Sequence, residues 1–259
     1  MALAGVLLLG YVVGTGGVRE ILRFNRWRDV GIIVLFHIYF AYIADLWSLQ
    51  YLSSADSALI YNLSPFLTAL FSFFLLGERL SIQKWIGLFI GFGALVAELF
   101  CYSGNNCSMP LIPTIVLIGG VASAMYGWTV MRKLIVEQGL SIVVINGVGM
   151  LGGGVLSLLT SLVYEKWDPT PVTEWIPFLK LTFLIILAAN VVFYNLYGYL
   201  LSRYSATMLS FAGFITPFFA ALFGALFLGE SLSFHFCVAM TFVAFGLYLF
   251  YRDELNFSK

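Results

Sequence analysis

The stretch SPFLTALFSFFLLGERLS, from Ser64 to Ser81, occurs again in closely similar form as TPFFAALFGALFLGESLS, from Thr216 to Ser233. At a shift of 152 residues, ten of the 17 positions from Pro65 to Ser81 carry the same residue in both copies. Shared hydrophobicity alone does not explain these matches, because they include a proline, a glycine, a glutamate and a serine at fixed positions. The chain therefore contains an internal duplication.

The composition places the duplicated chain in a membrane. Of its 259 residues, 61% are hydrophobic and only 10% are charged, whereas about a quarter of the residues in soluble domains are charged. Apolar runs of roughly 18 residues or more recur along the whole length, and about 20 residues of helix cross a bilayer core. These runs are too long and too continuous for the alternating strands of a membrane barrel. We therefore expect an all-α polytopic membrane protein with one membrane domain over residues 1–259.

Nine transmembrane helices are predicted between the polar breaks of the sequence. The connections between them are short and rich in turn-forming residues, so no soluble domain with an active site is expected. The approximate bounds of the predicted spans are 1–18, 30–50, 55–77, 84–102, 111–132, 140–164, 176–202, 205–228 and 233–251.

Basic residues lie mostly on one side of this predicted bundle. If the loop REILRFNRWRD is cytoplasmic, alternation of the nine spans puts 11 of the 13 Lys and Arg residues inside. Only Lys166 and Lys180 then lie outside. Because cytoplasmic loops are enriched in Lys and Arg, we expect a plasma or inner membrane protein with a cytoplasmic C-terminus and with residue 1 outside.

The two copies of the duplicated stretch have opposite orientations in this topology. They end the third and the eighth predicted spans, and an odd separation of five helices inverts the second copy in the bilayer. Inverted repeats are typical of secondary transporters, in which two related halves open a central site to either side in turn. We therefore expect residues 30–102 to superpose on residues 182–251 by rotation about an axis in the membrane plane.

A longer pattern surrounds the first copy, in which an alanine- and serine-rich helix start precedes P…LL.GERLS…W.G…G. In this sequence the pattern reads Ala55, Ser57, Ala58, Pro65, Leu76, Gly77, Glu78, Arg79, Leu80, Ser81, Trp85, Gly87 and Gly91. It resembles the EamA-type branch of the drug/metabolite transporter superfamily over about residues 30–251, although the second copy has Ser231 where the first has Arg79. Proteins similar to this have ten helices in two five-helix repeats. The resemblance implies that fold without its first helix, with an N-truncated first repeat over 1–102 and an inverted second repeat over 111–251. Either the start of the sequence is truncated or the protein is a nine-helix variant.

Polar side chains inside the spans are the candidates for a substrate site, because an ionisable group there costs about 2.5–3.5 kcal/mol and usually faces a cavity or a partner. Asp45 lies in the second span, with Tyr42 on the same helical face. The resemblance implies that this span lines the central cavity. Asp45 would there hold a proton or a cationic group of the substrate; alternatively it reaches outward to the interface or accepts a local hydroxyl.

The seventh span, AANVVFYNLYGYLL, carries a second group of polar side chains. Asn190, Tyr194 and Tyr197 fall on one face at spacings of four and three residues. Amides and phenols suit a zwitterionic or hydroxylated metabolite, but they also hold membrane helices together. Tyr126 and Trp128 in the fifth span are further candidates for substrate binding.

The duplicated stretch itself is predicted to be structural. Pro65 and Pro217 lie about twelve residues before the ends of their spans, where a proline bends a helix, so we expect a kink or a hinge at each. A glycine and a glutamate end each copy and are predicted to lie at the membrane interface, with the glutamate capping the next helix. These residues are Gly77, Glu78, Gly229 and Glu230.

Several other chemistries are not supported by the sequence. The segment GVGMLGG has GxGxxG spacing, but it lies inside a span and therefore predicts a helix-packing surface. His37 and His235 are the only histidines and lack carboxylate-rich surroundings, so we expect neither a metal site nor a cofactor. No phosphate loop or acid–base constellation is present, which argues against ATP-driven transport and against an enzyme. Cys101 and Cys107 either form a disulfide or are two free thiols.

The sequence thus predicts a secondary active transporter that moves a small polar metabolite, such as an amino acid or a similar organic solute, by alternating access. One alternative is a nucleotide-sugar or S-adenosylmethionine exchanger, since the resembled fold includes both. A second alternative is a non-transporting membrane protein or a pseudo-transporter that lacks the first helix. The expected partners are a small-molecule substrate and the lipid bilayer but not nucleic acid, with protons and a homodimer left open.

Overall fold

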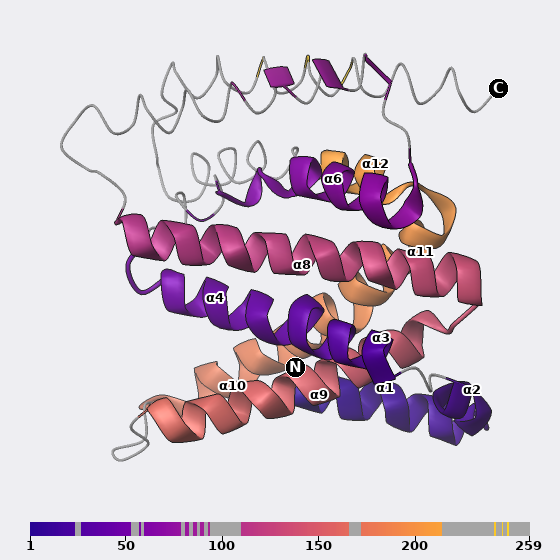
Figure 1. The fold of residues 1–259 in the computed structure, drawn as a ribbon. Helices are drawn as coiled ribbons and strands as arrows, with labels where there is room; N and C mark the ends of the chain where they lie inside the picture. Colours follow the sequence, from indigo (N-terminus) through magenta and orange to yellow (C-terminus); the bar gives the residue numbers. More distant parts are fainter. Residues whose placement is uncertain are drawn as a thin grey trace. The chain divides into compact units, whose positions relative to one another are not determined.

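The computed structural model describes residues 1–23, 27–52, 57, 60–78, 81–82, 85–86, 89–90, 93, 110–165, 172–213, 241, 245 and 248. Over these residues the regular elements are helices, without strands (Figure 1). The chain divides into two units. The first combines Met1–Ile43 with Tyr126–Tyr204, and the second combines Ala44–Met125 with Ser205–Lys259.

Four helical stretches among the described residues are long and apolar enough to cross a membrane. They agree to within several residues with the predicted spans 30–50, 111–132, 140–164 and 176–202. The expected all-helical membrane architecture is therefore confirmed, and most of the predicted spans 84–102, 205–228 and 233–251 lies outside the described residues. The four stretches are Arg28–Ser48, Leu111–Gln138, Ile142–Tyr164 and Trp175–Arg203.

The first unit is built around α9, the helix with the glycine-rich sequence. Helix α1 runs along α9, and α9 also contacts η1 (Figure 1). The complete elements of this unit are α1 (Ala2–Gly14), α2 (Val18–Arg23), α3 (Trp27–Ile32), η1 (Ile33–Phe40), α9 (Ile142–Tyr164), α10 (Trp175–Leu184), η3 (Ile185–Phe193) and α11 (Tyr194–Arg203).

Glycines on α9 bring the backbones of this unit close together. A Cβ atom added at Gly153 would lie 2.5 Å from Cγ2 of Ile38 in η1. On the side facing α1, a Cβ at Gly154 would lie 2.4 Å from the backbone nitrogen of Ala2. Small residues permit such close approach of helices in a bilayer, so the predicted role of GVGMLGG as a packing surface is confirmed.

Two of the membrane-spanning helices change from α to π geometry in their middle. The π-helical segment η1 interrupts the span Arg28–Ser48, and η3 interrupts the span Trp175–Arg203. Such segments are rare and often occur at functional sites. Their first residues, Ile33 and Ile185, are 152 positions apart, which is the shift that aligns the duplicated stretch. A shared irregularity of this kind is what duplicated helices predict.

The second unit contains α6 (Ser64–Leu76) and α12 (Ala206–Ala212), which pack on each other. Helices α4 (Ala41–Ser48) and α8 (Leu111–Gln138) each run from one unit into the other. Within this unit, Ser48 of α4 is buried and donates a hydrogen bond to the carbonyl oxygen of Pro113 in α8 at 3.1 Å.

The first copy of the duplicated stretch contains the whole of α6 and determines where this helix begins and ends. Pro65 lies in its first turn, after a turn at residues 62–63, where the missing N–H of proline costs no helical hydrogen bond. Gly77 ends the helix with φ of 66°, a left-handed conformation that favours glycine. Glu78 then accepts a hydrogen bond from the hydroxyl of Thr207 in α12 at 3.3 Å. Pro217, Gly229, Glu230, Cys101 and Cys107 lie outside the described residues.

Candidate functional site

Four aromatic side chains from three segments of the first unit form a contiguous group, here called the aromatic cluster. His37 comes from η1, Trp128 from α8, and Tyr194 and Tyr197 from α11. The ring centroid of Trp128 lies 4.2 Å from that of His37, 5.2 Å from that of Tyr194 and 4.3 Å from that of Tyr197. The rings of His37 and Tyr194 are 5.7 Å apart. These are the distances of direct ring contact.

Close backbone packing sets the position of the aromatic cluster. A Cβ added at Gly127 of α8 would lie 2.5 Å from Cα and 2.4 Å from Cβ of His37. Trp128 follows Gly127 directly, and its ring also lies against the imidazole of His37. His37 is 2% exposed and Trp128 is 9% exposed, whereas Tyr194 and Tyr197 are only partly buried. The cluster therefore has a buried floor and a more accessible edge.

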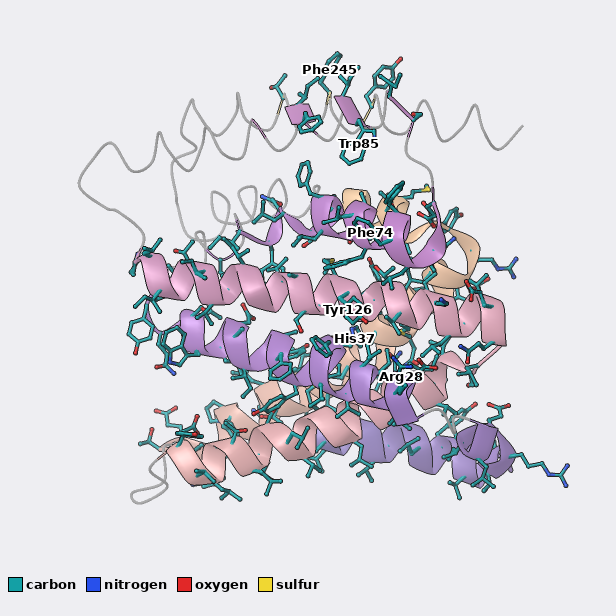
Figure 2. All side chains as sticks on the ribbon, viewed as in Figure 1. Arg28, His37, Phe74, Trp85, Tyr126 and Phe245 are labelled. Carbon is teal, nitrogen blue, oxygen red and sulfur yellow. The ribbon has the colours of Figure 1, made fainter. Side chains whose placement is uncertain are left out.

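A pair of phenols connects the aromatic cluster to α4. The hydroxyl oxygens of Tyr42 and Tyr194 are 2.9 Å apart, and either group can donate. Tyr126 lies on α8, with its ring centroid 5.4 Å from that of Phe36 in η1. Figure 2 labels Tyr126 and His37, which mark this contact region between α8 and η1. Of the tyrosines and the tryptophan predicted from sequence, Tyr42, Trp128, Tyr194 and Tyr197 are thus brought together.

Buried amides accompany these rings. Asn146 of α9 is 1% exposed, and its Nδ2 donates to Oδ1 of Asn195 in α11 at 3.1 Å. Asn195 in turn donates to the carbonyl oxygen of Val191 at 2.7 Å. Within the described part of the chain, Oδ1 of Asn146 has no hydrogen-bond partner. A buried acceptor left unsatisfied costs about 1–3 kcal/mol, so a ligand donor would be favoured there. The predicted residue Asn190 is buried in η3, with 2% of its surface exposed.

The predicted residue Asp45 belongs to the second unit. Its Oδ1 accepts a hydrogen bond from Oγ of Ser57 at 3.4 Å, and its side chain is partly buried. This contact corresponds to the local-hydroxyl alternative considered from the sequence. Among the described residues there is no group of three or more His, Cys, Asp or Glu side chains that is suited to a metal ion.

His37 is the member of the aromatic cluster that sequence reasoning missed as a site residue. The sequence points to His37 only in connection with a metal site, because no helical spacing relates it to residues 91 or more positions away. Its neighbour across the contact, Gly127, is the one local signal, since a glycine inside a membrane helix often marks a close approach.

Nearly the whole chain is similar to known transporters. The EamA-like transporter family matches residues 1–98 and 111–252. The S-adenosylmethionine/S-adenosylhomocysteine transporter of Chlamydia muridarum (strain MoPn / Nigg) is 34% identical, over 99% of this chain and 82% of that protein. The protein with the same name from Chlamydia trachomatis serovar L2 is 36% identical, over 99% of this chain and 80% of its own length.

Two more distant matches also cover nearly the whole chain. A WAT1-related chloroplastic protein of Arabidopsis thaliana is 27% identical, over 98% of this chain and 61% of that protein. One solved crystal structure superposes with a TM-score of 0.70 at 18% identity, covering 96% of this chain and 83% of the other. At that level of identity the likeness concerns the fold alone.

Proposed function

Because this chain belongs to the EamA-like transporter family, we propose that it carries S-adenosylmethionine across a membrane in exchange for S-adenosylhomocysteine. The family match confirms the resemblance seen in the duplicated motif, and the protein is a membrane transporter rather than an enzyme. The names of two relatives at 34% and 36% identity describe this pair of compounds. The proposed substrate is thus the S-adenosylmethionine alternative, in place of an amino acid.

The aromatic cluster is the observation that carries this proposal. S-adenosylmethionine has a positively charged sulfonium centre and a flat adenine ring. Aromatic faces attract a cation within about 6 Å, most strongly when water is excluded. They also stack on nucleic acid bases, a contact worth about 1–3 kcal/mol per base. His37 and Trp128 form a buried floor and Tyr194 and Tyr197 a partly exposed edge, so the cluster offers faces for both parts of this substrate.

The names of the relatives and hydrogen bonding favour the same substrate class. The two bacterial relatives are named for S-adenosylmethionine and S-adenosylhomocysteine, and neither name includes a nucleotide sugar. A nucleotide sugar is therefore the weaker alternative. Oδ1 of Asn146, buried on α9, would accept a hydrogen bond from an amino group of the substrate.

We also propose that the nine predicted spans form two inverted repeats, over residues 1–102 and 111–251, and that transport proceeds by alternating access. The duplicated stretch supports this arrangement. The same shift of 152 residues separates the starts of η1 and η3, and it separates Tyr42 from Tyr194.

Uptake into proteoliposomes tests the substrate. Methyl-labelled S-adenosylmethionine is offered outside vesicles that are loaded with S-adenosylhomocysteine or left empty. We expect faster uptake into the loaded vesicles, and competition by S-adenosylhomocysteine but not by methionine. Trp128→Ala should reduce uptake about tenfold, because a stacking or cation contact is lost, and Trp128→Phe should retain part of it.

A matched control is Trp175→Ala, which removes a tryptophan that is 54% exposed on α10 and lies outside the aromatic cluster. Its uptake should equal that of the wild type. Uptake of methionine or another amino acid without uptake of S-adenosylmethionine would instead support the amino-acid substrate. Failure to transport any of these solutes would support the non-transporting alternative.

A further inference from the structure

The hydrogen-bonded pair Tyr42 and Tyr194 joins two residues that are 152 positions apart. At this shift the two repeats align, so each tyrosine is the counterpart of the other. In an arrangement with two-fold symmetry, a residue contacts its own counterpart only close to the symmetry axis. The pair therefore marks the axis that would relate the two repeats.

A second contact marks the same axis on different helices. Ala2 of α1 and Gly154 of α9 are also 152 positions apart, and a Cβ at Gly154 would lie 2.4 Å from the backbone nitrogen of Ala2. The exposed faces of α1 and α9 also correspond at the shift of 152 residues. Three residues on α1 that are exposed have exposed counterparts on α9, in the pairs Leu3 with Val155, Val6 with Leu158, and Leu7 with Leu159.

We propose that the Tyr42–Tyr194 contact is the pivot of the transport cycle and is kept in both access states. The proposal rests on the alternating-access function proposed above. When inverted repeats exchange conformations, a contact between two residues in one state is replaced in the other state by a contact between their counterparts. This exchange converts the Tyr42–Tyr194 pair into itself. Because either hydroxyl can donate, the bond survives the exchange with at most a reversal of its direction.

The hydrogen bond between Tyr39 and Thr160 is instead expected in only one of the two access states. The hydroxyl oxygens of Tyr39 in η1 and Thr160 in α9 are 2.7 Å apart. Their counterparts at the same shift are Val191 and Leu8, which have no hydroxyl groups. Leu8 belongs to the buried core of the first unit, and Val191 packs against that core. The exchange would therefore replace a polar contact with an apolar one, so the Tyr39–Thr160 bond belongs to only one of the two states.

The Tyr42–Tyr194 pair also connects the proposed axis to the proposed substrate site. The hydroxyl of Tyr194 contacts Tyr42, and its ring belongs to the aromatic cluster. A substrate bound at these rings would stay beside the axis while access changes around it.

Distances between spin labels in the full-length protein test the pivot. The background is free of cysteine, with Cys101→Ser, Cys107→Ser and Cys237→Ser. Nitroxides are placed on exposed residues of the first unit through Leu7→Cys with Val192→Cys, a pair that does not consist of counterparts. Double electron–electron resonance should give two distances, one for each state. The counterpart pair Leu7→Cys with Leu159→Cys should give one distance, because the exchange leaves it unchanged.

The decisive comparison is between two identical chemical changes. Tyr39→Phe removes a bond of one state only, so the ratio of the two populations should shift by about threefold, as expected for an average hydrogen bond in a bilayer. Tyr42→Phe removes a bond present in both states, so the ratio should stay as in the background protein. An equal shift in both variants, or a single distance for the Leu7 and Val192 labels under all conditions, would overturn the pivot. If the two variants differ as expected but S-adenosylmethionine is not taken up, the proposed substrate is rejected and the pivot is supported.

Discussion

Asp45 places a carboxyl group inside the membrane span Arg28–Ser48. Ionised groups within a membrane span usually face a water-filled cavity or a partner, because lipid does not solvate them. The contact with Ser57 uses one acceptor position, whereas a carboxylate has about four. We propose that Asp45 serves transport by holding a coupling proton.

Replacing Asp45 by Asn tests this role. The amide keeps the size of the side chain and still accepts the hydroxyl of Ser57, so the protein should fold. Loss of the charge should reduce uptake of S-adenosylmethionine about tenfold and abolish any stimulation by a proton gradient. Asp29→Asn, the same change near the start of the same span, should leave uptake unchanged. If Asp45→Asn matches the wild type in rate and in pH profile, Asp45 is a packing residue.

Packing between α8 and η1 decides which side chains meet. No side-chain atom separates Gly127 from the backbone at His37, so the two helices touch directly there. In a bilayer, helices associate through such van der Waals packing, because lipid tails are as apolar as the side chains. The aromatic cluster is a consequence of this contact between elements.

A methyl group at Gly127 should therefore push the two helices apart. Gly127→Ala would place Cβ 2.4–2.5 Å from atoms of His37, and overpacking of this kind costs about 1–3 kcal/mol of stability. We expect a lower midpoint of thermal unfolding in detergent, followed by circular dichroism. Gly119→Ala is the matched control on the same helix, because nothing lies within 4 Å of its added Cβ. Equal midpoints for the two variants would show that α8 and η1 separate without cost.

At the scale of the whole molecule, charge placement predicts how the protein sits in the membrane. We propose that the C-terminus is cytoplasmic, since alternation of nine spans then leaves only Lys166 and Lys180 of 13 basic residues outside. The inversion of the second repeat follows separately, from the odd number of spans between the two copies.

Protease accessibility of tags in intact cells measures this orientation. A tag after Lys259 should be protected, whereas a tag inserted near Asn105, in a loop predicted to lie outside, should be cleaved. Both should be cleaved after the membrane is permeabilised, which controls for the accessibility of the tags themselves. Cleavage of the tag after Lys259 with protection of the tag near Asn105 would reverse the orientation. Cleavage of both tags in intact cells would contradict the odd number of spans predicted between them and remove the argument for inverted repeats.

The membrane class and the family of this protein were determined by the sequence alone. Both depend on features that are read along the chain, namely apolar runs long enough to cross a bilayer and a motif repeated at a shift of 152 residues. Helical spacing also identified Tyr194 and Tyr197 as neighbours on one face.

Only the tertiary structure decided that Trp128 meets His37 and that Tyr42 meets Tyr194. It also showed that η1 and η3 share π geometry at counterpart positions. Local periodicity describes which residues share a face of one helix, but not which faces of distant helices meet. That choice depends on where backbones can approach, as at Gly127 and Gly154, and it is made between segments about 90 to 150 residues apart.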